Sequence, residues 1–335
     1  MQAHLHHPAS AWRRAPAAVL LMLVMSLVAC GGEDPLAPTN GTTDPLPAQT
    51  EPADAGASAA LVTAQRIVFS SKRDGQYHIY KMDPAGQNVV RLTNTTKEDL
   101  YPALSFDGTR VAMVRPRTDA SNHVHNDIYI VNSDGTNGHW ARSTPCSCEL
   151  IRPSWSPNSA KLALTMSLNG TYYVAYLVLG TGQLGAYSTG YGGRPGTWAA
   201  YTPAGTIVYV GPTAKTLIQI NADGSGAKTL YTSSTPFGQP ALSPDGKKLA
   251  YIQIVDPSLS LPAIYVKDFG TGTNKRLTWD YGYNSQPTWS PDGSRIGFVS
   301  TRTGAAQIWK MDASGGSLAQ LTHTSSSEGY PSWSH

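Results

Sequence analysis

Pro287-Thr288-Trp289-Ser290-Pro291-Asp292-Gly293 is one of six copies of a short phrase that recurs along the chain. The Leu or Trp positions of successive copies are 43 to 51 residues apart, which is enough chain for four short strands and their turns. A period of about 40 to 50 residues is typical of the blades of a β-propeller. The other copies begin at Pro102, Pro153, Trp198, Pro240 and Pro331. The period therefore predicts an all-β fold of four-stranded antiparallel blades.

The segments between the copies have the patterns of the remaining strands of a blade. Each copy leads through a Pro-Asp-Gly turn into an alternating strand such as 295–300, followed by a third strand such as 307–312 and a fourth that ends in Leu-Thr. The first strand, at Arg66, has no copy ahead of it, and 331–334 is a copy with no strand after it. We expect six blades, with the C-terminal strand completing the first blade, so that no long sheet edge stays open.

The Trp residues of the phrase are most simply explained as core between blades. Alternate side chains of an inner strand face the neighbouring blade, and a large apolar ring suits that position. We expect Trp155, Trp198, Trp289 and Trp333 to be buried there.

Residues 1–30 have the pattern of a secretory signal rather than of a folded element. Arg13 and Arg14 precede an apolar run over 17–29, which is too short for a membrane span. The ending Leu27-Val28-Ala29-Cys30-Gly31 resembles the lipobox of bacterial lipoproteins. The resemblance implies that Cys30 is acylated and becomes the mature N-terminus, and Gly31, in place of an Asp, favours the outer membrane over the inner one. The alternative is an ordinary signal peptide with an incidental Cys.

Residues 31–65 differ in composition from the repeats that follow. They are rich in Pro, Ala, Thr and Gly, hold five acidic residues and contain no Lys or Arg. This composition predicts a flexible acidic tether, with an average span of about 30–35 Å. The repeat region 66–335 keeps 23 basic and 17 acidic residues, a net charge of +6 with no basic run. Such a mild charge does not favour nucleic-acid binding.

Motifs for cofactors or catalysis do not fit their required context. Gly180-Thr181-Gly182-Gln183-Leu184-Gly185 matches a dinucleotide fingerprint by letters, but the repeat places it at a strand turn with no helix after it. The chain contains neither a Gly-x-Ser-x-Gly elbow nor a His-Glu-x-x-His motif. We therefore predict no catalytic residues, no cofactor and no enzymatic activity.

His123-Val124-His125, with Asp119 and Asp127 close by, is the best candidate for a metal site, because alternate residues of an extended segment place two imidazoles on one side. The segment lies in the longest predicted loop, 115–126, where polar His is ordinary, and we predict no metal ligands on this ground. Cys146 and Cys148 are the only other cysteines besides Cys30. They form either a small, strained disulfide or remain as thiols or pair with a partner.

Chain direction places the variable loops of all blades at one end of the predicted propeller. These are the links between second and third strands and the links that lead into each phrase, which surround the central channel. Aromatic residues beside Arg on such loops are typical of a binding surface. The links carry Tyr101, Arg152, Tyr191, Arg194, Phe237, Tyr281, Tyr283, Glu328 and Tyr330. We predict partner binding by all of these except Phe237 and Glu328; the alternative is that several Tyr side chains only fill the channel.

Several motifs together resemble the propeller repeats of the TolB family over residues 66–335. They are the Pro-x-Trp-Ser-Pro-Asp-Gly hairpin, the Ser-x-Arg-x-Gly link at 71–75 and 300–304, the Ile-Tyr or Ile-Trp third strand and the Leu-Thr fourth strand. Such repeats occur in periplasmic scaffolds, peptidase propellers and sugar-acid lyases, so the resemblance is specific for the fold and weak for the function.

In TolB the propeller receives a peptidoglycan-associated lipoprotein at the channel mouth. The resemblance implies an envelope protein whose propeller binds another protein, itself a lipoprotein or not, or a glycan. With the lipobox at Cys30, we expect the protein to be lipid-anchored and to face the periplasm or the cell surface. This chain departs from TolB because a tether stands in place of the N-terminal α/β domain and the chain has the features of a lipoprotein. The alternatives are a carbohydrate-binding propeller and a metal-dependent sugar-acid lyase.

Overall fold

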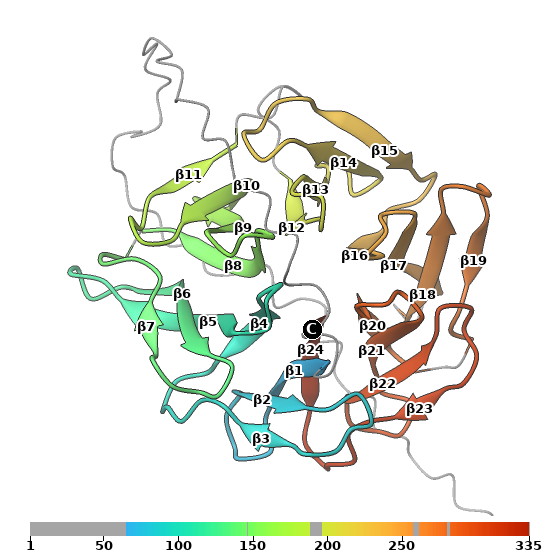
Figure 1. The fold of residues 1–335 in the computed structure, drawn as a ribbon, viewed down its shortest axis with the longest axis horizontal. Helices are drawn as coiled ribbons and strands as arrows, with labels where there is room; N and C mark the ends of the chain where they lie inside the picture. The colour runs from blue at the N-terminus through green and yellow to red at the C-terminus, as the bar shows by residue number, and fades with distance from the viewer. Residues whose placement is uncertain (1–64, 146, 188–195, 257–260, 280–281, 335) are drawn as a thin grey trace, which may run out of the picture. The chain divides into compact units, whose positions relative to one another are not determined.

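The computed structural model describes residues 65–334 apart from 146, 188–195, 257–260 and 280–281. Twenty-four strands form six four-stranded antiparallel sheets arranged as blades around a ring (Figure 1). Blade 1 consists of β24 (Glu328–Ser334), β1 (Arg66–Ser71), β2 (His78–Met82) and β3 (Val90–Arg91). Blade 2 consists of β4 (Leu100–Leu104), β5 (Arg110–Thr118), β6 (Val124–Asn132) and β7 (His139–Trp140). Blade 3 consists of β8 (Glu149–Trp155), β9 (Lys161–Leu168), β10 (Thr171–Val178) and β11 (Leu184–Ala186).

The other three blades repeat this order, with the first strand of each nearest the centre of the ring. Blade 4 consists of β12 (Thr197–Tyr201), β13 (Ile207–Val210), β14 (Thr216–Ile220) and β15 (Lys228–Thr232). Blade 5 consists of β16 (Gly238–Leu242), β17 (Lys248–Asp256), β18 (Leu261–Asp268) and β19 (Asn274–Arg276). Blade 6 consists of β20 (Asn284–Trp289), β21 (Arg295–Ser300), β22 (Gln307–Asp312) and β23 (Ala319–Gln320). The predicted six-bladed propeller is confirmed.

The C-terminal strand closes the ring by completing blade 1. β24 pairs antiparallel with β1, and Trp333 lies opposite Ile67 in the register. Two segments from the opposite ends of the propeller sequence thus share one sheet (Figure 1). This pairing gives β1 a partner on its inner edge, which would otherwise be an open sheet edge.

The Ser-Pro-Asp-Gly sequence forms the turn between the first two strands because each residue has a structural role. In blade 6 the Ser290 hydroxyl donates to Asp292 at 2.5 Å and accepts the backbone N–H of Arg295 at 2.9 Å. Gly293 has a φ of 69° and its N–H donates to the Ser290 carbonyl at 2.9 Å. Gly adopts this left-handed conformation without steric cost, which explains its place in the repeat.

The Leu-Thr sequence ends the fourth strand of blades 1, 5 and 6 with a side-chain hydrogen bond. Thr322 Oγ1 accepts the buried N–H of Ile308 at 2.8 Å, and Thr93 and Thr278 accept N–H groups from the third strands of their own blades in the same way. The hydroxyl thus replaces a backbone partner where the short fourth strand stops, so that no N–H is buried unpaired.

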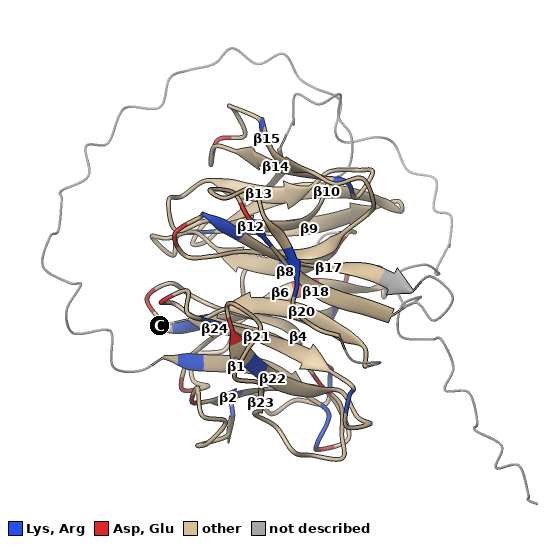
Figure 2. Cartoon of the chain, turned by 90° about the vertical axis from the view of Figure 1, so that its right-hand side faces the viewer, with Lys and Arg blue, Asp and Glu red and all other residues tan. Residues whose placement is uncertain are grey.

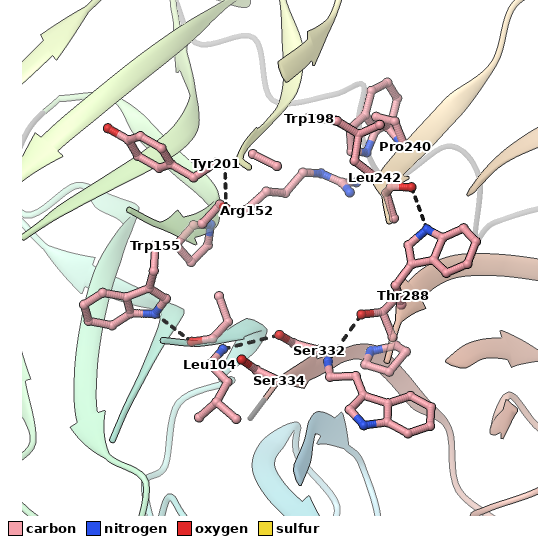
Figure 3. A pocket seen from close by; sticks show the side chains of 18 of the residues that line it. Leu104, Arg152, Trp155, Trp198, Tyr201, Pro240, Leu242, Thr288, Ser332 and Ser334 are labelled. Carbon is pink, nitrogen blue, oxygen red and sulfur yellow. Dashed lines mark hydrogen bonds between the residues drawn. The ribbon is translucent and has the colours of Figure 1, made fainter. Parts of the chain in front are cut away.

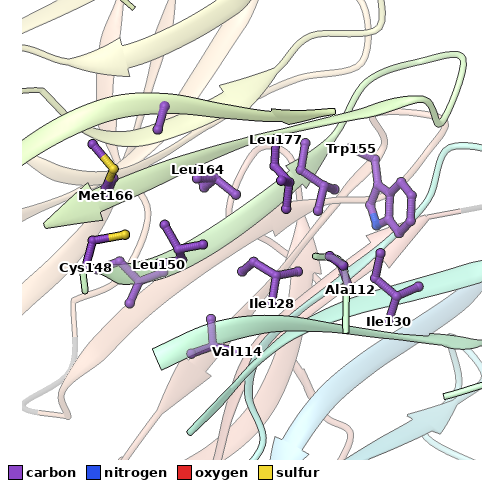
Figure 4. Close-up of a cluster of buried hydrophobic side chains, with 14 residues drawn as sticks. Ala112, Val114, Ile128, Ile130, Cys148, Leu150, Trp155, Leu164, Met166 and Leu177 are labelled. Atoms are coloured by element: carbon purple, nitrogen blue, oxygen red, sulfur yellow. The ribbon is translucent and has the colours of Figure 1, made fainter. Parts of the chain in front are cut away.

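The core lies between blades and is built from facing apolar side chains. Between blades 2 and 3, Val114 and Ile128 pack against Leu150 and Leu164 (Figure 4). Trp155 is 2% exposed, and its indole N–H donates to the carbonyl of Ala103 in β4 at 2.9 Å. The Trp289 and Trp333 side chains are also buried between blades, as predicted.

The prediction for Trp198 is wrong. Its side chain is half-buried and lines the central cavity, and Tyr201 takes the inter-blade position instead. Tyr201 pairs with Ile207 in the register as Trp155 pairs with Leu162, so the equivalent residue in blade 4 is a Tyr. The prediction aligned Trp198 with the Trp of the other copies of the phrase, although Trp198 lies three residues further from the following turn than Trp155 does.

The Arg residues of the Ser-x-Arg links fix the start of the inner strand. Arg73 donates to the Ser71 hydroxyl at 2.8 Å, lies 4.5 Å from the centre of the Tyr80 ring and pairs with Glu328 of β24 at 3.2 Å. Arg302 likewise bonds to Asn284 of β20. Basic and acidic residues are otherwise interspersed over the side of the propeller in Figure 2.

Candidate functional site

A β-bulge interrupts the inner strand of every blade at the same place. In blade 2, for example, the register between β4 and β5 shifts between Leu100 and Ala103. One residue of each bulge has a positive φ, between 50° and 56°. These six residues, which we call the channel ring, are Tyr101, Arg152, Trp198, Gln239, Gln286 and Tyr330. A bulge redirects a side chain out of the sheet, and a positive φ in a non-glycine residue costs about 1–3 kcal/mol, so the fold sustains strain at all six positions.

The channel ring surrounds a central cavity with a volume of about 460 Å³. Inner strands of all six blades line it, and every residue of the channel ring belongs to the lining. Figure 3 shows two of them, Arg152 and Trp198, among the lining side chains. Among the described lining residues, Arg152 is the only charged side chain, and none is a His, Asp or Glu. The rest of the described wall is made of aromatic, Pro, Ala, Leu and Val residues with neutral polar Ser, Thr and Gln.

Arg152 lies between two aromatic rings of the channel ring. Its guanidinium carbon is 5.0 Å from the ring centre of Tyr101 and 5.0 Å from that of Trp198. Burial lowers the pKa of Arg152, because its cation has lost water without gaining a carboxylate among the described residues. The guanidinium stays protonated nonetheless. The Arg152 guanidinium is therefore a positive charge in the cavity wall. It lies between two aromatic faces, and its charge is available to a ligand.

The other side of the channel ring is neutral and hydrogen-bonded. The Tyr101 and Tyr330 rings lie 4.2 Å apart between their centres, and burial raises the pKa of Tyr330. Gln286 Oε1 accepts the backbone N–H of Tyr330, and Gln239 Oε1 accepts that of Gln286. Each Gln thus keeps its side-chain N–H₂ group free of any hydrogen bond within the described part of the chain, which leaves donors for a bound molecule.

The structure brings together three of the residues predicted from sequence to bind a partner: Tyr101, Arg152 and Tyr330 are all in the channel ring. Tyr283 is half-buried outside the cavity lining, and its backbone bonds to Thr301. Tyr191, Arg194 and Tyr281 lie outside the described residues.

Two residues that the sequence placed on the loops around the channel are buried in the structure and stabilise the fold. Phe237 is 4% exposed and packs in the core with Tyr251. Glu328 is 2% exposed and forms the ion pair with Arg73. Both were placed among exposed loops because the sequence does not show how far each inner strand extends toward the channel mouth.

Sequence reasoning missed Trp198, Gln239 and Gln286. The signal was present, since the residue before the first Pro of the phrase is a channel-ring residue in five blades, and Trp198 precedes Ala199 in the sixth.

Sequence reasoning also missed Trp279, which is 73% exposed on the link from β19 to β20 and lies under the guanidinium of Arg276. Composition alone did not distinguish this exposed Trp from the buried ones.

The predicted loop 115–126 is mostly strand. β5 and β6 extend to Thr118 and Val124, so His125 is paired with Arg117 within the sheet. Asp127, which the sequence grouped with the two His residues, is buried and pairs with Arg117 at 3.2 Å instead. Burial raises its pKa. The three residues whose ligand atoms do converge are Asp119, His123 and His125.

Cys148 is 6% exposed and disulfide-bonded. Its sequence neighbour Cys146 lies outside the described residues, as does Cys30.

Comparison with known proteins agrees with the fold. The family model of the TolB beta propeller domain matches residues 204–335. An uncharacterized protein of Agrobacterium fabrum is 30% identical over 182 residues, which are 53% of this chain and 60% of that protein. The Tol-Pal system protein TolB of Alcanivorax borkumensis is 34% identical over 84 residues, 25% of this chain and 19% of that protein. The chain thus spans less than two thirds of the length of these relatives.

A crystal structure of TolB from Acinetobacter baumannii superposes with a TM-score of 0.64 at 21% identity, covering 81% of this chain and 66% of that one. Fold and channel ring define a six-bladed β-propeller with an aromatic-walled central cavity. The repeats identify it further as a TolB-like propeller. Among the described residues there is no helix with the length and apolar character needed to span a membrane.

Proposed function

We propose that the protein is a non-enzymatic lipoprotein of the bacterial cell envelope whose propeller binds a protein partner at the channel mouth. The observation that carries this proposal is the channel ring, in which all six blades direct a strained residue into one cavity. Strain repeated at six equivalent positions is expected where a site needs side chains held in fixed directions. The similarity to TolB proteins supports protein binding as the use of this site.

The charge of the cavity indicates what the partner presents. Arg152 is a desolvated cation between Tyr101 and Trp198, and no described residue neutralises it. A partner segment that inserts a carboxylate would form a charge-assisted hydrogen bond with the guanidinium. Its apolar neighbours would pack on the aromatic wall. We infer a partner segment with an acidic residue flanked by apolar ones.

The N-terminal region supports the location. The signal-like segment 1–30 ends at the lipobox Cys30, and 31–65 has the composition of a tether. Acylation of Cys30 would anchor the protein to the membrane, and a tether of this length would hold the propeller about 30–35 Å from it. We propose the outer membrane as the site of anchoring. Labelled palmitate that enters the parent but not Cys30→Ala tests this part.

The two alternatives predict different contents of the cavity. A metal-dependent lyase needs His and acidic ligands that converge on the channel, and the described lining has neither. A carbohydrate-binding propeller would use the same aromatic wall by stacking sugars on it. Because both ligands would use the same wall, an experiment is needed to distinguish protein binding from glycan binding.

Site-specific photo-crosslinking tests the proposal most directly. A photoreactive residue replaces Gln239 in the channel ring of the full-length protein, and envelope fractions are irradiated and analysed by mass spectrometry. A matched control carries the same residue at exposed Ser314, in the turn between β22 and β23 at the other end of the blades. We expect a protein adduct at position 239 alone, which disappears when Arg152→Met is added.

Two results would contradict the proposal. Equal adducts at 239 and 314 would indicate non-specific contact. Adducts at 239 that survive Arg152→Met and Trp198→Ala together, in a variant with a normal melting temperature, would show that neither the Arg152 cation nor the Trp198 ring binds the partner. If only glycan is recovered at 239, the carbohydrate-binding alternative replaces protein binding.

A further inference from the structure

A group of polar side chains lies at the tip of the β5–β6 hairpin, away from the central cavity. The turn 119–123 is closed by a hydrogen bond from the N–H of Asp119 to the carbonyl of His123 at 2.8 Å. Asp119 Oδ1 accepts the backbone N–H groups of Ser121 and His123 at 2.9 and 2.8 Å. These bonds fix the carboxylate, so that Oδ2 faces the imidazoles of His123 and His125.

Three ligand atoms converge at this tip. Asp119 Oδ2 is 3.1 Å from His125 Nε2 and 3.7 Å from His123 Nδ1, and all three atoms lie within 4.8 Å of one another. A tetrahedral ion with ligands at about 2.0–2.1 Å requires ligand atoms about 3.3 Å apart. The two separations from Asp119 lie on either side of that value, and the two imidazole nitrogens lie within 4.8 Å of each other. Small rotations of His123, which is 63% exposed, would complete the geometry.

A carboxylate from the neighbouring blade lies behind one imidazole. Glu149 Oε1 in β8 is 3.6 Å from His125 Nδ1, the ring nitrogen that points away from Asp119. Glu149 Oε2 accepts the backbone N–H of Asn126 at 2.9 Å, which holds the carboxylate in place. Metal-bound His residues almost always direct their second nitrogen to such an acceptor, which fixes the tautomer with Nε2 free to bind.

The kinds of side chain gathered here also suit a metal. Two carboxylates and two imidazoles are gathered in this one cluster. A simple His–Asp ion pair would explain one contact, but not three donors around one point with a second carboxylate behind them.

The geometry points to a zinc site formed by Asp119, His123 and His125, with Glu149 as the residue that orients His125. Two imidazoles and one carboxylate suit Zn²⁺ better than Ca²⁺ or Mg²⁺, which prefer oxygen ligands. The fourth position faces solvent beside exposed His123 and would be taken by water. Because Glu149 is three residues before Arg152 in β8, about 10 Å along the strand, the ion would connect the hairpin of blade 2 to the strand that carries the channel-ring cation.

Zinc titration of the full-length protein tests the site. His4, His6 and His7 lie in the signal-like segment 1–30 and are replaced by Ala in any sample that retains it, because these imidazoles could bind metal independently. After chelator treatment, we expect calorimetry to give one Zn²⁺ per chain, and we expect Co²⁺ to give the absorption spectrum of a tetrahedral or five-coordinate site. His125→Ala and Asp119→Asn should each weaken binding at least 100-fold. Glu149→Gln should weaken it 10–100-fold, the usual effect of losing such a partner.

His323→Ala is the matched control, because His323 is exposed on the link after β23 and belongs to no such group in the described structure. Its affinity for Zn²⁺ should equal that of the parent. The proposal is overturned if the parent binds no Zn²⁺ in a one-to-one ratio, or if His125→Ala and His323→Ala bind equally. Without metal, each variant must have the same melting temperature as the parent. If a variant melts at a lower temperature, His123→Ala is used in its place, because His123 is exposed.

Discussion

The Arg152 guanidinium carbon lies 5.0 Å from the centre of the Trp198 ring, and these two residues are the bulge positions of neighbouring inner strands β8 and β12. The contact joins blades 3 and 4 across the wall of the cavity. It also holds a cation in a partly desolvated place with no acidic partner among the described residues. Such a group makes the free energy of folding less favourable in the unbound protein, because it loses hydration without gaining an ion pair. A bound anionic ligand would supply the missing partner.

Arg152→Met should therefore leave the free energy of unfolding equal to that of the parent or raise it. The loss of about 0.5–1 kcal/mol of cation–π attraction is offset by removal of an unpaired charge that is half-buried. Urea unfolding measures the difference. Arg73→Met is the matched comparison, because it leaves the buried Glu328 carboxylate without its ion pair and should cost about 3 kcal/mol. A similar loss for both variants would mean that Arg152 is structural.

Trp289→Ala should destabilise the propeller by about 3–5 kcal/mol, because it empties an inter-blade position and breaks the indole N–H bond to the Ala241 carbonyl. Trp279→Ala removes the same side chain from a position that is 73% exposed, and should change stability by less than about 0.5 kcal/mol. Thermal unfolding of both variants gives the comparison. An unchanged melting temperature for Trp289→Ala would contradict the core assignment.

Stability should depend on pH through the turn carboxylates. The Ser290 hydroxyl lowers the pKa of Asp292, as Ser243 lowers that of Asp245. A carboxylate with a lowered folded pKa contributes stability above its unfolded pKa of about 3.9, and this contribution is lost as pH falls through the folded value. Asp292→Asn should thus be less stable than the parent at pH 6, with a difference that shrinks below pH 4. A difference that is constant between pH 6 and pH 2 would refute this explanation.

Thr322→Val should cost about 1–3 kcal/mol, because it preserves the shape of the side chain and leaves the buried N–H of Ile308 without an acceptor. Thr322→Ser keeps the hydroxyl and should recover most of that loss. Amide hydrogen exchange at Ile308 provides a local readout, and should accelerate in the Val variant alone. Equal protection in both variants would show that the hydroxyl is not the acceptor that matters.

Much of the architecture could be predicted from sequence because the same pattern of strands and turns recurs in six copies. Turn chemistry at 290–293 and the Leu-Thr ends are local interactions, made between residues close in sequence, and the phrase at 331–334 without a following strand indicated closure onto β1. The candidate site was predictable in part. Tyr101, Arg152 and Tyr330 were found as aromatic and basic residues near the channel, whereas Gln239 and Gln286 have no such chemical signal.

The sequence by itself thus determined the number of blades, the order of strands in each blade and the closing partner, since these follow from period, alternation and turn residues. Only the tertiary structure decided which side chains face the cavity. The inner strands carry a bulge that directs one side chain of each into the cavity; in blade 4 that residue is Trp198, while Tyr201, three residues later, faces the core. The same holds for Asp119, His123, His125 and Glu149, which meet because β8 of the next blade packs against the hairpin, a contact that no local pattern encodes.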